Sequence, residues 1–155
     1  RVERVECGQD FTVIVDYAHT DDSLRKLYEA FSSAKKIAVL GSTGGGRDTW
    51  KRPVLGKIAD EYCDEIIITN EDPYDEDPMK IINDVAGGVT SHTPTIILSR
   101  REAIAHALAL AKTGEVVLIT GKGTDPYIMG PNGTKETWDD AQVAREELGK
   151  LLKKS

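Results

Sequence analysis

Two glycine-rich stretches hold the residues of this chain that are best suited to bind an anion. The longer stretch runs from Gly41 to Pro53 and contains four glycines together with Arg47, Lys51 and Arg52. Glycine lets the backbone approach a ligand closely, and three cationic side chains within six positions would attract a phosphate or a carboxylate. The shorter stretch, residues 121–125 (Gly-Lys-Gly-Thr-Asp), places another cation near a carboxylate. We therefore expect a site for a phosphate-bearing or zwitterionic ligand.

The longer stretch does not match two familiar nucleotide-binding loops. Its glycine spacing is that of the start of a Walker A loop, but Arg47 and Asp48 stand where that loop needs lysine and serine or threonine. The G-x-G-x-x-G pattern of dinucleotide-binding folds fits only loosely, and the next apolar run ends in Thr69 instead of an acidic residue. A solvated strand-to-helix turn is the alternative, which the three basic residues disfavour.

The elements that must position these loops follow from the apolar pattern. Short apolar runs predict strands over residues 12–17, 37–40, 65–69, 95–98 and 115–120. Helical spacing predicts helices over residues 24–31, 54–62 with Pro53 at the first position, 78–85, 100–111 and 138–151. The residues expected to cap these helices are Asp77, Ser99 and one of Asp21, Asp22 and Ser23. This alternation predicts an α/β fold: a Rossmann-like, doubly wound, mostly parallel sheet of about six strands with helices on both faces.

Two more predicted loops carry ionisable residues to the carboxyl edge of that sheet, where such folds bind their ligands. Asp16, Tyr17 and His19 follow the first strand. Glu71 and Asp72 follow the third and open a segment with five carboxylates in seven positions. We interpret Glu71 and Asp72 of this segment as a recognition site for an ammonium group or a metal-bound ligand, with a solvated turn as the alternative. For His19, a structural or solvated histidine remains the alternative to a catalytic or binding role.

The bulk composition bounds the class of protein. The chain has 155 residues, of which 39% are hydrophobic and 30% charged, as expected of one soluble domain. Its net charge of −6 disfavours a general nucleic-acid partner. It shows no membrane span and no signal peptide, so we expect a cytoplasmic protein. Cys7 and Cys63 are far apart, which predicts buried thiols and no metal site. The start at Arg1, with no methionine, suggests a domain excised from a longer chain.

Several motifs and their order along the chain resemble the C-terminal domain of the Mur ligases, and most closely that of the UDP-N-acetylmuramoyl-tripeptide synthetases. The resemblance covers essentially all 155 residues as a single domain. The motifs are Arg1-x-Glu3, residues 16–20 (Asp-Tyr-Ala-His-Thr), the glycine-rich stretch through Pro53, Glu71-Asp72-Pro73, residues 101–104 (Arg-Glu-Ala-Ile) and Gly121-Lys122-Gly123.

The resemblance implies an ATP-dependent ligase of peptidoglycan precursor synthesis in bacteria. In that family a central P-loop domain binds ATP and magnesium and activates the carboxylate of a UDP-MurNAc-peptide as an acyl phosphate, which the amine of an incoming amino acid then attacks. The C-terminal domain brings that amino acid and closes over the site, which protects the acyl phosphate from water. This chain has no Walker A loop, and the central ATPase and N-terminal UDP-binding domains are absent from it. We therefore expect the isolated chain to be inactive, with no tightly bound cofactor and with the central domain of its parent chain as its partner. Neither nucleic acid nor a membrane is an expected partner.

The resemblance also implies roles for individual residues. Arg1 and Asp16 match the contacts to the ribose of ATP. Arg47 matches the arginine that grips the carboxylate of the incoming amino acid, a pairing that suits a guanidinium group. His19 and Lys122 are the expected catalytic residues. The remaining residues expected to bind the amino acid are Glu71, Asp72, Tyr74, Gly121 and Asp125, and those expected to bind an anion are Lys51, Arg52 and Arg101.

The chain departs from the family pattern at two places. Family members that add meso-diaminopimelate carry D-N-P-R, whose arginine binds the extra carboxylate, whereas this chain has Glu71-Asp72-Pro73-Tyr74. An acidic loop suits a cationic side chain, so we expect L-lysine or a similar diamino acid. Thr124 and Asp125 replace the usual histidine and glutamate. The alternatives are a folylpolyglutamate or cyanophycin-type ligase domain, a free-standing nucleotide- or phosphate-binding regulatory module, and a hydride-transfer Rossmann enzyme.

Overall fold

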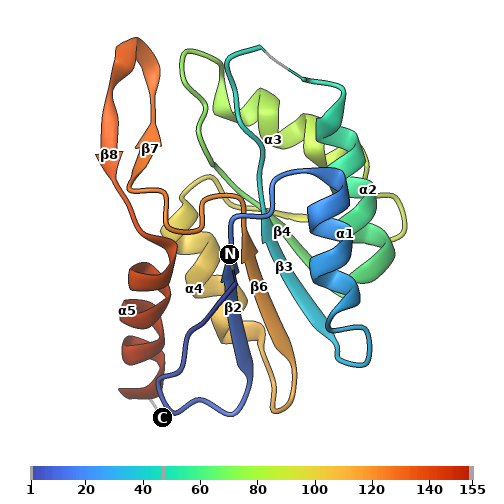
Figure 1. Cartoon of the computed structure of the whole chain (residues 1–155), viewed down its shortest axis with the longest axis vertical. Coiled ribbons are helices and arrows are strands. Elements are labelled where there is room, and N and C mark those ends of the chain that lie inside the picture. Colours follow the sequence, from blue (N-terminus) through green and yellow to red (C-terminus); the bar gives the residue numbers. More distant parts are fainter. Residues whose placement is uncertain (1, 47, 154–155) are drawn as a thin grey trace.

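A six-stranded sheet organises the chain, and strands alternate with helices along the sequence (Figure 1). The computed structural model describes residues 2–46 and 48–153. The strands are β1 (Glu3–Arg4), β2 (Thr12–Asp16), β3 (Lys36–Leu40), β4 (Glu65–Ile68), β5 (Thr95–Ile96), β6 (Val116–Thr120), β7 (Tyr127–Met129) and β8 (Lys135–Thr137). The helices are α1 (Asp21–Glu29), α2 (Lys51–Tyr62), α3 (Pro78–Ala86), α4 (Arg100–Leu110), α5 (Asp140–Lys153) and a short 3-10 turn (Pro131–Gly133).

The strand order in the main sheet is β1-β2-β6-β3-β4-β5, and β7 and β8 form a separate hairpin. Strands β2, β6, β3, β4 and β5 are parallel to their neighbours, and only the edge strand β1 runs antiparallel, along β2. The predicted Rossmann-like, mostly parallel sheet is therefore confirmed. Parallel strands end at the same edge of a sheet, so the loops after β2, β3, β4 and β6 lie together there.

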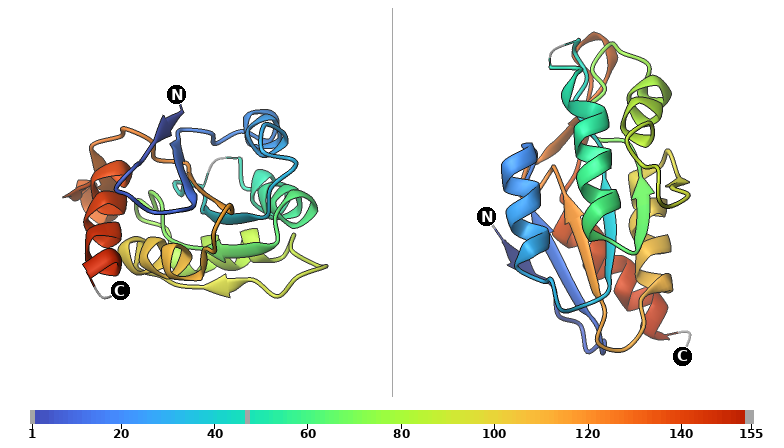
Figure 2. Two further views of the ribbon diagram at one scale, coloured as in Figure 1. Left: turned by 90° about the horizontal axis from the view of Figure 1, so that it is seen from below. Right: turned by 90° about the vertical axis from the view of Figure 1, so that its right-hand side faces the viewer.

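Helices cover both faces of the sheet (Figure 2). Helices α1, α2 and α3 pack on one face, and α4 and α5 on the other. Alternate strand residues enter opposite cores: Ile37 and Val39 pack with α4 and α5, whereas Ala38 and Leu40 pack with α1 and α2. Because both faces are covered, the central strands are apolar throughout, which is why they appear in the sequence as continuous apolar runs.

Some element boundaries differ from the sequence prediction, and local bonding explains the differences. Helix α1 is capped by Thr20, whose side chain accepts from the Ser23 N–H while the Ser23 side chain bonds back to Thr20. Helix α2 begins at Lys51 instead of Val54, with Pro53 still in the first turn, where a missing N–H costs nothing. Strand β5 ends at Ile96, because its partner β4 ends at Ile68. Asp77 and Ser99 cap α3 and α4 as predicted.

Within residues 2–46 and 48–153, no helix combines the length and the apolar character that crossing a bilayer requires. The same residues contain no group of three or more His, Cys, Asp or Glu side chains placed to hold a metal ion. Cys7 is partly exposed and Cys63 is buried, and neither forms a disulfide. Burial raises the pKa of the Cys63 thiol to about 12.

Gly56 and Gly149 both lie inside helices but in opposite surroundings. A Cβ atom on Gly56 of α2 would lie 2.0 Å from the Val85 carbonyl oxygen of α3, whereas one on Gly149 of α5 would meet nothing within 4 Å. We expect Gly56→Ala to lower the free energy of unfolding by about 1–3 kcal/mol, because overpacking outweighs the gain in helix propensity. Gly149→Ala should raise it by about 0.5–1 kcal/mol. Urea titrations of the two variants test this, and changes of the same sign would contradict it.

Candidate ligand-binding site

The loop after β3 and the loop after β4 pack backbone against backbone. We call residues 41–50 the glycine loop and residues 69–77 the acidic loop. Gly44 donates its N–H to the Asp72 carbonyl oxygen at 2.6 Å. A Cβ atom on Gly44 would lie 2.1 Å from the Pro73 carbonyl oxygen, and one on Gly41 would lie 2.4 Å from that of Thr69. These two glycines are therefore required for the close approach of the loops.

A pocket of about 550 Å³ opens at this edge of the sheet. Its lining residues are His19, Gly41, Ser42, Thr43, Gly44, Gly45, Asp48, Lys51, Leu55, Glu71 and Tyr74. Four residues predicted from the sequence thus share one pocket: His19, Lys51, Glu71 and Tyr74. Arg1 and Arg47 lie outside the described residues.

Glu71 is the buried carboxyl group of this pocket. It is 4% exposed, and its Oε2 atom accepts a hydrogen bond from Thr43 Oγ1 at 2.8 Å. Burial raises the pKa of Glu71 above its ordinary value, and the charge of Arg100 and the Thr43 hydroxyl oppose this rise. Gly121, at φ +105°, passes so close that a Cβ atom there would lie 2.0 Å from Glu71 Oε1. Gly121 therefore shapes the wall behind Glu71, although it does not line the pocket itself.

His19 and Tyr74 close two sides of the pocket. The His19 Nδ1 atom lies 3.0 Å from the Tyr17 carbonyl oxygen, and the two rings are tilted against each other with centroids 4.6 Å apart. Tyr74 adopts φ +54°, which is rare for a residue with a side chain, and donates its N–H to the Met129 carbonyl oxygen at 3.1 Å. The hairpin thus fixes the backbone of Tyr74. Asp16, expected at the ribose of ATP, ends β2 opposite Thr120 and does not line this pocket.

Lys122 joins the acidic loop to the hairpin and does not line the pocket. It is 0% exposed, and its Nζ atom donates to Asp72 Oδ1 at 2.9 Å, to Asp125 Oδ2 at 3.2 Å and to the Tyr127 carbonyl oxygen. Asp72 Oδ1 also accepts the Met129 N–H at 2.9 Å. In this position the ammonium is buried and its donors are used by protein oxygens. The catalytic role of Lys122 stays a prediction for an activity assay. Asp72 and Asp125, which were predicted to bind the amino acid, form ion pairs with Lys122.

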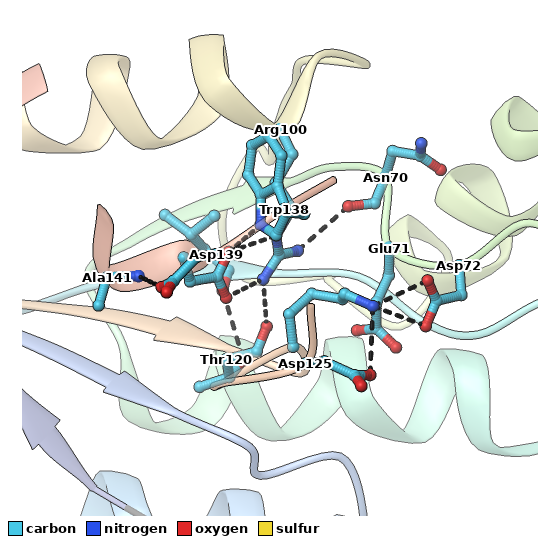
Figure 3. Close-up of polar contacts among 12 residues, drawn as sticks. Asn70, Glu71, Asp72, Arg100, Thr120, Asp125, Trp138, Asp139 and Ala141 are labelled. Atoms are coloured by element: carbon cyan, nitrogen blue, oxygen red, sulfur yellow. Dashed lines mark hydrogen bonds and ion pairs between the residues drawn. The ribbon is translucent and has the colours of Figure 1, made fainter. Parts of the chain in front are cut away.

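Arg100 forms a second buried ionic centre, which the sequence analysis missed. Its Nε and Nη2 atoms donate to Asp140 Oδ1 and Oδ2 at 2.9 and 2.8 Å, a bidentate pair. The same guanidinium donates to the carbonyl oxygens of Asn70 at 3.1 Å and Thr120 at 2.8 Å (Figure 3). Arg100 therefore ties the ends of β4 and β6 to the start of α5. The sequence signal for this residue is an arginine in the first turn of a helix, where a cation opposes the helix dipole.

Two of the three predicted anion-binding cations have protein partners instead. Arg52 is fully buried and donates to Glu76 and Asp84. Arg101 pairs with Glu146 and Glu147 of α5. Anion binding by Arg52 and Arg101 stays a prediction, and neither of them lines the pocket. Of the cations in the described part of the chain, Lys51 lines it.

The fold and the pocket define a ligand-binding α/β module, with glycine-rich backbone, one lysine, one buried carboxyl and an imidazole at the carboxyl edge of a parallel sheet. Comparison with known proteins narrows this class. Residues 1–123 match the family described as "Mur ligase, glutamate ligase domain". The chain belongs to the Mur ligase family.

Individual relatives are similar to the chain over nearly its whole length. The UDP-N-acetylmuramoyl-L-alanyl-D-glutamate–2,6-diaminopimelate ligase of Syntrophomonas wolfei is 43% identical over an alignment 153 residues long, which covers 96% of this chain and 31% of that protein. The UDP-N-acetylmuramyl-tripeptide synthetase of Roseiflexus sp. is 42% identical over 97% of this chain and 31% of its own length. A solved UDP-N-acetylmuramoyl-L-alanyl-D-glutamate–2,6-diaminopimelate ligase matches the fold with a TM-score of 0.89 and 31% identity, over 98% of this chain and 32% of that one. The chain thus spans about a third of the length of these relatives.

Proposed function

We propose that this chain is the C-terminal, amino-acid-binding domain of an ATP-dependent ligase that adds a diamino acid to a UDP-MurNAc-peptide in peptidoglycan precursor synthesis. The observation that carries this proposal is the identity of 43% over 96% of the chain to a ligase of that name. The pocket supports it, because cationic, anionic and aromatic groups line one cavity, as recognition of a zwitterionic amino acid requires.

The proposed reaction assigns this domain the incoming amine. The amine attacks the carbonyl carbon of an acyl phosphate, a peptide bond forms, and phosphate leaves. The attacking amine must lose a proton in this step, and the imidazole of His19, which lines the pocket, is the general base that we assign to accept it. Lys51 and Arg47 would attract the carboxylate of the amino acid, Arg47 on the sequence argument alone. The carboxyl group of Glu71 would face an ammonium group of the same amino acid.

ATP and magnesium belong mainly to the rest of the ligase in this proposal. ATP supplies the phosphoryl group that activates the peptide carboxylate. The described residues offer no cluster of carboxylates for a metal, so we assign no magnesium ligand to them. Arg1 and Asp16 remain proposed contacts to the ribose, and the isolated chain should not catalyse ligation.

For the amino acid we rank 2,6-diaminopimelate first and L-lysine second. Two of the three relatives compared carry diaminopimelate in their names. The lysine expectation depended on free carboxylates in the acidic loop, and in the structure Asp72 pairs with Lys122 while Glu76 pairs with Arg52. The absence of the D-N-P-R arginine is the remaining argument for lysine.

The test is phosphate release by the full-length ligase with ATP, magnesium and UDP-MurNAc-dipeptide, comparing meso-diaminopimelate, L-lysine, L-ornithine and no amine. We expect turnover that depends on a diamino acid, and none from the 155-residue chain alone. Arg47→Ala and Glu71→Gln should each raise KM for the amine by about tenfold or more, because each removes a charged contact. Turnover with lysine but not diaminopimelate would reverse our ranking. Failure of every amine would overturn the proposed function.

A further inference from the structure

A buried ion pair lies directly behind the pocket without lining it. Arg52, in the first turn of α2, is 0% exposed. Its Nη1 and Nη2 atoms donate to Glu76 Oε2 at 2.7 Å and Oε1 at 2.9 Å, and Nη1 also donates to Asp84 Oδ2 of α3 at 3.0 Å. The hydrogen bonds from Arg52 hold the pKa of Glu76 below its ordinary value, so the carboxylate stays charged.

Arg52 and Glu76 contact the two ends of residues 43–46, which we call the tip of the glycine loop. Glu76 Oε1 accepts the Gly46 N–H at 3.1 Å, and Arg52 Nη2 lies 3.5 Å from the Thr43 carbonyl oxygen. Between these contacts, Gly45 and Gly46 have φ angles of +91° and +75°. Glycine visits many other conformations at little cost, so such a tip keeps one shape only if its surroundings hold it.

The tip forms a wall of the pocket. Thr43, Gly44 and Gly45 line the cavity, whereas Arg52 and Glu76 do not. We infer that Arg52 and Glu76 are positioning residues, which latch the glycine loop to the acidic loop and so preserve the form of the pocket that captures the amine. They act through the loop backbone and not by contact with the substrate. The kinetic part of this inference rests on the proposed function.

A pair that only stabilised the fold would change the free energy of unfolding and leave the loop and KM as they are. Lys80 gives the matched control, because it donates to the same Asp84 Oδ2 atom at 3.1 Å but is 62% exposed on its side chain. Among the residues that the structure describes, no hydrogen bond joins the Lys80 side chain to the glycine loop. Lys80→Gln therefore removes a cation next to Asp84 and leaves the contacts of Arg52 and Glu76 with the glycine loop in place.

The experiment compares Glu76→Gln, Arg52→Lys and Lys80→Gln in the full-length ligase, with two readouts. Hydrogen–deuterium exchange of peptides covering residues 41–50 reports on the loop without any need for turnover. We expect Glu76→Gln and Arg52→Lys to accelerate this exchange by about tenfold, because lysine cannot reproduce the guanidinium fork and glutamine cannot accept two charged bonds. In steady-state assays both variants should raise KM for the amine by about tenfold while kcat changes less than about threefold. Lys80→Gln should change neither readout.

The two readouts separate this inference from the proposed function. If hydrogen–deuterium exchange over residues 41–50 is unchanged in both Glu76→Gln and Arg52→Lys, the inference is overturned, whatever the activity of these variants. Faster exchange with an unchanged KM in an active ligase would overturn it too, because the latch would then not shape the pocket. Faster exchange in a protein that uses none of the amines would support the latch and overturn the proposed function instead. Midpoints of thermal unfolding show whether any variant has failed to fold.

Discussion

We expect the replacement of Arg100 with methionine to lower the free energy of unfolding by about 3–5 kcal/mol. The substitution keeps much of the side-chain volume but leaves the Asp140 carboxylate, which is 0% exposed, without its cation. It also removes the donors to the Asn70 and Thr120 carbonyl oxygens. The buried charge is then left without its cation, and among the described residues only the Trp138 Nε1–H still donates to Asp140 Oδ1, at 2.7 Å. The uncompensated cost of keeping that charge out of water is the physical reason for the large effect.

The neighbouring arginine provides the control. Arg101 pairs with Glu146 and Glu147, but its side chain is 41% exposed. Water replaces much of what an exposed pair contributes, so Arg101→Met should cost only about 0–1 kcal/mol. Guanidinium titrations of both variants measure the difference. Equal losses would mean that burial does not decide the contribution of these two pairs.

Lys122→Met is the second substitution with a large expected effect. It leaves Asp72 facing Asp125 without the ammonium between them, and we expect a loss of about 3 kcal/mol of unfolding free energy. This value lies at the lower end of the range for buried pairs, because Asp72 keeps the hydrogen bond from the Met129 N–H. Adding Asp72→Asn should restore part of the loss, since the uncompensated charge is then removed.

Activity separates the two interpretations of Lys122. If Lys122 positions the hairpin, the double variant Lys122→Met/Asp72→Asn recovers stability and part of the turnover together. If Lys122 is catalytic, as the sequence motif implied, Lys122→Met abolishes turnover with little change in stability, and the second substitution restores nothing. Denaturant titration and the phosphate-release assay on the same preparations distinguish these outcomes.

The fold could be predicted from the sequence because the pattern of apolar residues is local. Runs such as residues 37–40 and 116–119 are apolar at every position, which is typical of parallel strands buried on both faces. The first residue of a helix is harder to predict, because several neighbouring residues can each cap the N-terminus of the helix. Asp21, Asp22 and Ser23 all suit the position, yet Thr20 holds it, with Ser23 completing the capping box.

The site was predicted in part. The loops at the strand ends could be predicted, and four residues predicted from the sequence, His19, Lys51, Glu71 and Tyr74, line one pocket. The pairing of charges could not, because the partners lie far apart in the sequence: Arg100 and Asp140 are separated by 40 residues, and Lys122 and Asp72 by 50. Lys51 and Arg52 illustrate the limit. They are adjacent and chemically alike, but the helix turns one toward the pocket and the other into the protein.

The packing of Gly44 and Gly41 against the acidic loop has a consequence for engineering the specificity of this pocket. At these points the backbone of one loop lies directly against the backbone of the other, so neither can change its path without displacing the other. Suppose that only the acidic loop were replaced by one from another protein, in order to admit a different amino acid. The carbonyl groups of the new loop would then lie against a glycine loop that fits the original acidic loop. The transferable unit is the pair of loops, and a successful exchange of substrate preference would have to move both at once.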